Sequence, residues 1–357
     1  MRIGVAGLGS SGSYLLHLLT EAGFDAVGFD PKKDGYYIPC GYAANRRRMD
    51  HLLPLAGIDF SQYIESEAGD VIFSGSSLRE ITFNSRGLVT FDKNRLESDL
   101  LKNCKWSREQ IKGDFDLLVD ATGISRTLLP RVEDYRMHTI EYLTTLKEKK
   151  EFQFRYFANG SGYFWIFPKG DKYHVGAGSD SIEKIRDSLV QYRPEKVVSR
   201  DIRLKPLFHS ISKDNIIGVG EAIGTVSPVT GEGIGPSMTS ALLLFLAIKK
   251  SNDIQTIKNL YAAHLSHYVA KEGGKYRIRS NIINPDKIFR GSRIWENGVL
   301  ESRAKAKGQT VEEYKTQNLL RIEVLPSHVA GVLLALLDED SFGATTDAMI
   351  PVDGGIK

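Results

Sequence analysis

Three glycines near the start of the chain have the spacing of a turn that binds a dinucleotide. Gly7, Gly9 and Gly12 form a GxGxxG pattern between an apolar segment and a segment with helical periodicity. The first glycine of such a turn allows a tight bend, the second lets the backbone approach a pyrophosphate, and the third lets helix and strand pack closely. Asp30 ends the next apolar segment, 18 residues after Gly12, where a carboxylate can accept hydrogen bonds from an adenosine ribose. These four residues predict a dinucleotide site.

A second glycine-rich segment, Val219–Ser237, follows more than two hundred residues later and distinguishes NAD from FAD. An apolar stretch leads to Glu221, and a loop of small residues then enters a helix that we expect to begin around 233–236. The carboxylate can hold ribityl hydroxyls, and the amino-terminal end of the helix offers free N–H groups and a positive dipole to the N1/O2 edge of a flavin. An NAD-binding protein has no use for such a segment. The sequence therefore predicts FAD and a redox reaction.

The composition is that of an ordinary globular protein of about two domains. The chain has 357 residues, 41% hydrophobic and 25% charged, and its net charge of +3 is too small to indicate a nucleic-acid partner. The two cysteines, Cys40 and Cys104, cannot form a disulfide framework or a metal cluster, and they suit a reducing compartment. The longest strongly apolar run, Ala241–Ile248, is far shorter than the roughly 20 residues of a membrane span. Because the chain also enters a strand at its start, we expect a cytoplasmic protein without a metal, for which peripheral membrane contact stays open.

The order of patterns along the chain predicts an α/β domain interrupted by an antiparallel sheet. Residues 1–135 and 205–260 are interpreted as the two parts of a Rossmann-like FAD-binding domain, with a helix opened by Asp92. Residues 136–204 alternate and are interpreted as an inserted antiparallel β substrate domain, which part of 60–95 could join. Within that part, the four residues Asn84–Gly87 have the composition of a hairpin turn.

Aromatic residues are concentrated in the middle of the antiparallel segment. The stretch 151–179 alternates and is interrupted at "ANGSG" and "PKGDK", which predicts a meander. Alternation places about half of the aromatic side chains on one face. Tyr163, Trp165 and Phe167 are on such a face, where they could line an apolar cavity or simply form the core of the sheet.

Several further motifs carry a resemblance to a known family. They are "PCG" at 39–41, "DKNRLESDLL" at 92–101, "DATG" at 120–123, "YFWIFPKGD" at 163–171 and the segment 221–234. Together with the GxGxxG turn, they make residues 1–260 resemble the geranylgeranyl reductase family, whose members are flavoproteins with the glutathione-reductase type of FAD domain. The pattern Y-x-W-x-F-P-K-G-D is specific, whereas the other motifs occur in many flavin enzymes.

Carried over position by position, the resemblance implies a set of FAD contacts. These are Ser11, Asp30, Cys40, Gly41, Ala43, Arg95, Ala121, Glu221, Gly233 and Ile234, and the glycines Gly7, Gly9, Gly12, Gly123 and Gly231 complete the expected cofactor site. Two positions depart from the family pattern, because Asp30 stands where glutamate is commoner and Glu221 where aspartate is usual. Each change keeps the carboxylate and moves it by one methylene, so we expect an altered affinity for FAD with the chemistry retained.

The activity that the resemblance implies is hydrogenation of double bonds in a geranylgeranyl chain. An isolated double bond must receive a proton and a hydride, and reduced FAD supplies the hydride. The family places a cysteine near the flavin, which makes Cys40 the candidate catalytic residue. His174 and His209 are candidates for the proton donor, which the sequence does not identify. The implied partners are an isoprenoid lipid or prenyl diphosphate as substrate and NAD(P)H or a ferredoxin-like protein as electron donor.

From about residue 261 the chain resembles the last third of a short-chain dehydrogenase. The matching pieces "IRSNIINPD", "LPSHVAGVLLAL" and "IPVDGG" predict a strand, a helix and a last strand. The Tyr-x-x-x-Lys motif of that family does not precede them, so 261–357 is expected to be an α/β tail without catalytic activity. Two other functions remain open for the whole chain: a flavin monooxygenase, which has the same FAD domain, and a non-catalytic fusion relic.

Overall fold

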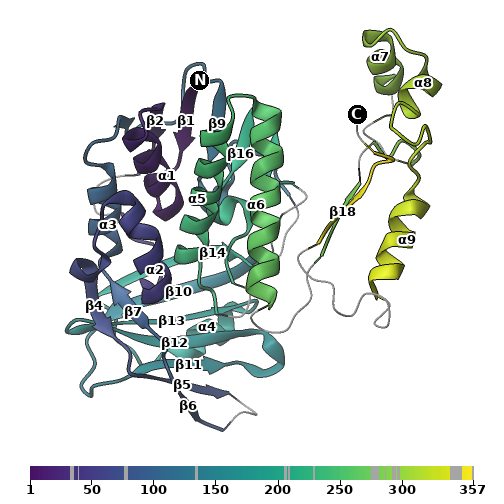
Figure 1. The fold of residues 1–357 in the computed structure, drawn as a ribbon. Coiled ribbons are helices and arrows are strands. Elements are labelled where there is room, and N and C mark those ends of the chain that lie inside the picture. Colours follow the sequence, from purple (N-terminus) through teal and green to yellow (C-terminus); the bar gives the residue numbers. More distant parts are fainter. Residues whose placement is uncertain are drawn as a thin grey trace. The chain divides into compact units, whose positions relative to one another are not determined.

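The computed structural model divides the chain into two compact units, Met1–Ala262 and Ala263–Lys357 (Figure 1). It describes residues 1–32, 36–38, 40–75, 79–132, 136–204, 207, 210–227, 230–274, 281–285, 287–291, 295, 298–337 and 348–355. Pro39 of the "PCG" motif and His209 lie outside the described residues.

A six-stranded sheet forms one part of the first unit. Its strands are, in spatial order, β15 (Ser212–Lys213), β16 (Ile216–Gly218), β9 (Leu117–Asp120), β1 (Arg2–Ala6), β2 (Asp25–Phe29) and β8 (Trp106–Ser107). All neighbours except β15 and β16 run parallel, and Gly4 of β1 is opposite Val27 of β2 and Leu118 of β9. The inner strands are almost entirely buried, as their continuous apolar runs predict.

Helices occur where the chain has helical periodicity, and several of them lie beside this sheet (Figure 1). The helix after the first strand contacts β1 and β2 and lies against two further helices, and its Tyr14 and Leu15 are fully buried. Asp92 caps the predicted helix that follows it, accepting a hydrogen bond from the N–H of Arg95. The helices of this unit are α1 (Ser10–Glu21), α2 (Arg46–Leu52), α3 (Lys93–Leu101), α4 (Ile182–Leu189) and α5 (Ile234–Lys250), while α6 (Ile254–Gly274) continues into the second unit.

The hairpin predicted around Asn84–Gly87 is wrong, because the strands on its two sides pair with different partners. The strand before the turn is β6 (Ile81–Asn84), which pairs with β5 (Asp70–Gly75); the strand after it is β7 (Leu88–Phe91), which pairs with β3 (Ala43–Asn45) and β4 (Ile64–Glu67). Positive φ angles of 50° at Arg86 and 97° at Gly87 reverse the backbone there. The turn therefore carries the chain from one sheet into another.

A seven-stranded sheet forms the other part of the first unit. Its order is β14 (Lys196–Arg203), β10 (Arg136–Thr144), β13 (Lys172–Ser179), β12 (Gly162–Lys169), β11 (Phe152–Tyr156), β5 and β6. The meander predicted for 151–179 is confirmed, since β11, β12 and β13 are antiparallel neighbours. The pairing of β11 with β5 is parallel, and through it two strands from 60–95 join this sheet.

The two faces of this sheet pack against different partners. Tyr163, Trp165 and Phe167 lie on one face, which we call the aromatic face, and they are at most 8% exposed. The alternate residues of the same strand lie on the opposite face and pack against α4, where Ile185 is fully buried. The strand alternation thus separates one row of aromatic side chains from the helix-covered core.

The second unit holds the predicted strand, helix and final strand, and two further helices precede the predicted helix. β17 (Ile282–Pro285) pairs in parallel with β18 (Met349–Val352), and the helices are α7 (Val299–Ala306), α8 (Val311–Lys315) and α9 (Pro326–Leu337). A small core of Phe289, Leu300, Ala304 and Tyr314 stabilises α7 and α8.

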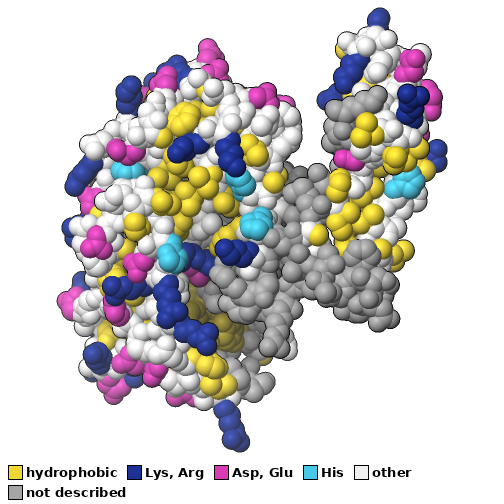
Figure 2. Space-filling model, viewed as in Figure 1, with side chains coloured by type: hydrophobic (Ala, Val, Ile, Leu, Met, Phe, Trp, Pro, Cys, Tyr) yellow, Lys and Arg dark blue, Asp and Glu magenta, His cyan; other side chains and the backbone are white. Residues whose placement is uncertain are grey.

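Charges of both signs are distributed over the molecular face in Figure 2. Lys and Arg side chains of the first unit lie among Asp and Glu side chains there, with apolar side chains between them (Figure 2). Among the described residues, no helix combines the length and the apolar character that a membrane crossing requires.

Candidate functional site

The GxGxxG turn connects β1 to α1 and consists of glycines at which a side chain would collide. A Cβ on Gly12 would lie 1.8 Å from the carbonyl oxygen of Gly7, and a Cβ on Gly7 would lie 2.5 Å from that of Ala121. Gly7 also has a φ of +87°, which L side chains rarely adopt. Gly9 precedes α1 as its N-cap and has no side chain with which to cap it, which leaves the first N–H groups available to an anion. The structure therefore brings the predicted residues Gly7, Gly9, Gly12 and Ala121 together.

Asp30 lies beside this turn at the end of β2. Its buried carboxylate accepts hydrogen bonds from the backbone N–H groups of Leu8, at 2.7 Å, and Lys32, at 3.0 Å. The Lys32 Nζ lies 3.1 Å from the same carboxylate and 3.7 Å from the place of a Cβ on Gly9. Lys32 thus adds a positive charge at the turn. This residue is not among those predicted from the sequence, where only its position two residues after Asp30 could have indicated it.

The second glycine-rich segment folds back onto the first. At Gly220, where φ is +65°, a Cβ would lie 2.6 Å from Ser11 Oγ on α1 and 3.2 Å from Ser237 Oγ on α5. Helix α5 begins at Ile234 after the N-cap Gly233, and it packs against α1. Both helices follow a glycine and have no acidic residue in the first turn. Two positive helix ends consequently meet near Gly220.

Glu221 is already engaged by two arginines. Its Oε1 accepts from the backbone N–H of Arg203 at 2.9 Å, and its Oε2 accepts from the Arg200 guanidinium. A Cβ on Gly123 would lie 3.3 Å from the same Oε2. Burial lowers the pKa of Arg200, but the Glu221 carboxylate raises it, and the net direction is upward, so the pair is ionic. A ribityl hydroxyl would share a carboxylate whose two oxygens both have protein donors.

Helix α3 brings a lysine, rather than the expected arginine, to the glycine turn. Lys93 Nζ lies 2.7 Å from Glu97 Oε1, which also accepts from Ser10 Oγ at 2.9 Å. Arg95 is two residues further on, about 200° around the helix. Its guanidinium lies over the Tyr63 ring, and its side chain is 54% exposed. Arg95 therefore lies on the other side of α3, and the four-residue spacing of Lys93 and Glu97 was the signal for the inward pair.

The aromatic face contacts the loop before α5 at one end and the segment around Gly41 at the other. The Tyr163 hydroxyl donates to the loop before α5, and a Cβ on Gly231 would lie 2.1 Å from that hydroxyl. At the other end of the row, a Cβ on Gly41 would lie 2.4 Å from the Phe167 ring. Trp165 stands between them on β12. The three predicted substrate-lining residues thus lie between two segments that were assigned to the cofactor.

Cys40 is half-buried next to Gly41. Desolvation raises the pKa of its thiol to about 11, although the positive charges of Lys93 and Arg200 lower it. The nearby Ala43 opens β3 and packs against the aromatic cluster. The Cys40 thiol therefore stays protonated at neutral pH and does not have the thiolate character of a nucleophile.

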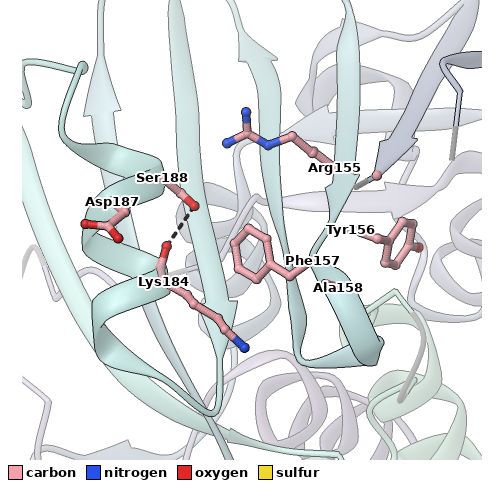
Figure 3. A pocket seen from close by; sticks show the side chains of 8 residues that line it. Arg155, Tyr156, Phe157, Ala158, Lys184, Asp187 and Ser188 are labelled. Atoms are coloured by element: carbon pink, nitrogen blue, oxygen red, sulfur yellow. Dashed lines mark hydrogen bonds between the residues drawn. The ribbon is translucent and has the colours of Figure 1, made fainter. Parts of the chain in front are cut away.

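A cavity of about 440 Å³ lies elsewhere on the seven-stranded sheet (Figure 3). Residues from the end of β11 and from α4 line it, among them Arg155, Phe157 and Lys184. Arg155 is opposite Phe164 in the sheet and so projects from the α4 face. None of the predicted site residues that the structure describes lines this cavity.

The arrangement fits a nucleotide cofactor that carries a flavin. Bare backbone at Gly7, Gly12 and Gly220 lies next to two uncapped helix ends, which suits a negatively charged group. Beside them the aromatic row is buried in a hydrophobic cluster. On that row, Trp165 Nε1 is buried and has no hydrogen-bond partner among the described residues, so it is available to a bound group.

No family model matches the chain. It is 30% identical over 165 residues to digeranylgeranylglycerophospholipid reductase 3 of Methanosphaera stadtmanae, covering 40% of this chain and 41% of that protein. It is 36% identical over 121 residues to the digeranylgeranylglycerophospholipid reductase of Methanococcus vannielii, 30% of each chain. An uncharacterized oxidoreductase of Bacillus subtilis is 34% identical over 112 residues, 30% of this chain and 16% of that protein. The chain thus matches less than half the length of these relatives.

Solved structures share the fold at low identity. A geranylgeranyl bacteriochlorophyll reductase-like protein from Thermoplasma acidophilum has a TM-score of 0.64 at 16% identity, covering 76% of this chain and 86% of its own. PqsL, a probable FAD-dependent monooxygenase from Pseudomonas aeruginosa, has 0.57 at 16%, with 74% and 90% covered. The flavin-dependent brominase Bmp2 has 0.59 at 11%, with 85% and 89% covered. The chain therefore has the mixed α/β fold of flavin-dependent oxidoreductases.

Proposed function

We propose that this protein is an FAD-dependent oxidoreductase of the geranylgeranyl reductase type, which hydrogenates double bonds of an isoprenoid chain. The relatives named digeranylgeranylglycerophospholipid reductase support the substrate class, and the flavin-dependent enzymes of the same fold support the cofactor. The observation that carries the proposal is the approach of Gly220 to Ser11, because it joins the two glycine-rich segments into one site beside the aromatic face.

Separate parts of the site would hold separate parts of FAD. The start of α1 would bind the pyrophosphate, Asp30 would accept from a ribose, and Lys93 would add a positive charge. Glu221 would hold ribityl hydroxyls, and the amino-terminal end of α5 would bind the flavin edge. The remaining residues that we assign to the cofactor site are Gly7, Gly9, Ser11, Gly12, Cys40, Gly41, Ala43, Ala121, Gly123, Gly231, Gly233 and Ile234.

The aromatic face would bind the hydrocarbon chain. Tyr163, Trp165 and Phe167, which are buried in a hydrophobic cluster, would form an apolar wall for a substrate without polar groups and would exclude water from it. Bound FAD, once reduced, would supply a hydride to a double bond. Cys40 stays a candidate catalytic residue, and with a pKa of about 11 its thiol would meet the flavin as a protonated, uncharged group.

We expect NAD(P)H or a ferredoxin-like protein to reduce the flavin. A prenyl diphosphate or an isoprenoid lipid would be the substrate, and the lipid would require peripheral contact of a cytoplasmic protein with a membrane surface. The tail 261–357 would be an accessory in this reaction.

An anaerobic single turnover tests this function. The purified protein is loaded with FAD, reduced with dithionite and mixed with a geranylgeranyl lipid, and the flavin absorbance and the product mass are followed. We expect the oxidised flavin spectrum to return while the lipid gains two hydrogens per double bond. A flavin that stays reduced until oxygen is admitted would contradict the proposal.

A flavin monooxygenase is the second candidate, because structures of that class and of a brominase have TM-scores close to that of the reductase-like protein. It predicts that substrate hydroxylation accompanies reoxidation by oxygen in the same experiment.

A further inference from the structure

A buried histidine and a buried glutamate form a pair on the aromatic face. His174 on β13 and Glu141 on β10 are both 0% exposed, and His174 Nδ1 lies 2.8 Å from Glu141 Oε1. The Tyr37 hydroxyl contacts both, at 2.8 Å from His174 Nδ1 and 3.2 Å from Glu141 Oε1. Burial and the charge of Glu141 raise the pKa of Tyr37, so its hydroxyl keeps its proton. These contacts hold the imidazole through one nitrogen.

The strand register places this pair in the proposed substrate site. In antiparallel strands, directly opposite residues lie on the same face. His174 is opposite Phe167, and Glu141 is linked to Trp165 through Gly176, which is opposite both. A Cβ on Gly176 would lie 2.1 Å from the Trp165 ring, so the indole lies over the bare backbone between its own strand and β10. The pair is thus part of the same surface as the aromatic row.

Polar atoms of this surface lack partners within the described part of the chain. His174 Nε2, Glu141 Oε2 and Trp165 Nε1 are buried and make no hydrogen bond there. Buried polar atoms are nearly always hydrogen-bonded, and three exceptions on adjacent strands point to a group that the described part of the chain does not supply. The unpartnered nitrogen of His174 is Nε2, whereas Nδ1 contacts Glu141.

A buried carboxylate on Nδ1 fixes the tautomer and orientation of an imidazole, and it stabilises the charge when Nε2 takes up a proton. Saturation of a double bond needs such a proton at one carbon while a hydride reaches the other. We propose that His174 gives this proton from Nε2, while Glu141 and Tyr37 act as positioning residues. The inference rests on the proposed function.

The step balances with reduced flavin as the reductant. The π bond of the substrate breaks and two C–H bonds form, one with the hydride and one with the proton of the imidazolium. His174 is left neutral and regains a proton from water. Tyr37 is the member of the group that is only half-buried.

Other charged and titratable groups surround the pair. Lys196 of β14 lies 4.3 Å over the Tyr37 ring, and Lys93 of α3 and Lys169 of β12 lie 5.7 and 5.5 Å over the Tyr42 ring. The Tyr42 ring is 5.1 Å from that of His174. The other charged or titratable groups near the pair are Cys40 of the same segment, Glu97 of α3 and Arg200 of β14. These groups set the local field, so the test compares variants of the pair under identical conditions.

The experiment compares His174→Gln with His138→Gln in the anaerobic single turnover. His138 is a matched control, because it pairs with Asp201 at 2.5 Å but lies on the opposite face of β10 and is 47% exposed. We expect His174→Gln to slow lipid-dependent reoxidation about 100-fold or more, as for loss of a general acid, and His138→Gln to stay within about twofold. Affinity for FAD and reoxidation by oxygen should be unchanged in both.

The conservative variants Glu141→Gln and Tyr37→Phe test the positioning roles and keep the test valid if His174→Gln does not fold. We expect lipid-dependent reoxidation to be slower in Glu141→Gln than in wild type, because the neutral amide no longer stabilises the imidazolium. Imidazole NMR of the purified protein provides a readout that does not depend on turnover: the His174 signal should respond to Glu141→Gln.

The outcomes separate the two proposals. Wild-type protein that never passes hydride to the lipid overturns the proposed function, and the inference with it. Active wild-type protein with equal rates for His174→Gln and His138→Gln overturns the inference alone. Equal reoxidation rates for Glu141→Gln and wild type, or a His174 signal that does not respond to Glu141→Gln, overturn it as well.

Discussion

The two large sheets of the first unit contribute to the site in opposite ways. Around the six-stranded sheet, the site consists of glycines. Because Gly7, Gly12 and Gly220 have no side chains, the backbone and the helix ends beside them are accessible to a ligand. On the seven-stranded sheet, it consists of side chains that are present, some with buried polar atoms that lack a partner among the described residues, such as His174 Nε2 and Glu141 Oε2.

This difference separates binding from reaction. Bare N–H groups at helix ends attract a charged cofactor without chemistry of their own. A buried imidazole and carboxylate can hold and move a proton but need a partner to act on. Substitutions at Gly7, Gly12 or Gly220 should therefore abolish cofactor binding, whereas changes on the aromatic face should leave the affinity for the cofactor unchanged.

The largest effect is expected from Gly12→Val. The first added carbon would lie 1.8 Å from the Gly7 carbonyl oxygen, so the turn must open. We expect FAD binding to weaken at least about 100-fold, which corresponds to about 3 kcal/mol of overpacking strain. Flavin fluorescence titration measures the affinity. Gly69→Ala is the control, because a Cβ there would meet nothing within 4 Å. Unchanged binding in Gly12→Val would remove this turn from the site.

A smaller and different effect is expected from Gly176→Ala. The new methyl group would displace the Trp165 ring, which lies 2.1 Å from its position. We expect about a tenfold slower single turnover with the lipid, given the sensitivity of catalysis to misplaced groups, and FAD affinity equal to that of wild type. If this variant lost FAD as well, the separation of binding from reaction would not hold.

An effect of similar size, but on FAD binding, is expected from Lys93→Met on α3. This change removes a buried positive charge at the turn and leaves Glu97 with Ser10 as its partner. A charged hydrogen bond contributes about 1.5 kcal/mol, so FAD should bind about tenfold more weakly. Arg95→Met on the exposed side of the same helix should change the affinity less than twofold. Equal losses in both variants would restore Arg95 as a cofactor contact.

Much of the architecture was predictable because its signals are local. The apolar runs and glycine turns marked β1, α1 and the meander, and Asp92 marked the start of α3. The turn at Asn84–Gly87 was recognised, but its strands were assigned to one hairpin, because composition does not show which strands a turn connects. The family motif implies a cofactor contact at Arg95, whereas the helical phase of α3 points Lys93 inward.

The amino-acid sequence alone determined the GxGxxG turn, since the collision of a Cβ on Gly12 with the Gly7 carbonyl oxygen and the positive φ of Gly7 are properties of a few neighbouring residues. It also determined which residues alternate along the aromatic strands. Only the tertiary structure decided that Gly220 meets Ser11, and that Glu141, His174 and Trp165 come together across β10, β13 and β12. The reason is that cross-strand register depends on how distant segments pair, and a shift of one residue would have turned this histidine to the opposite face.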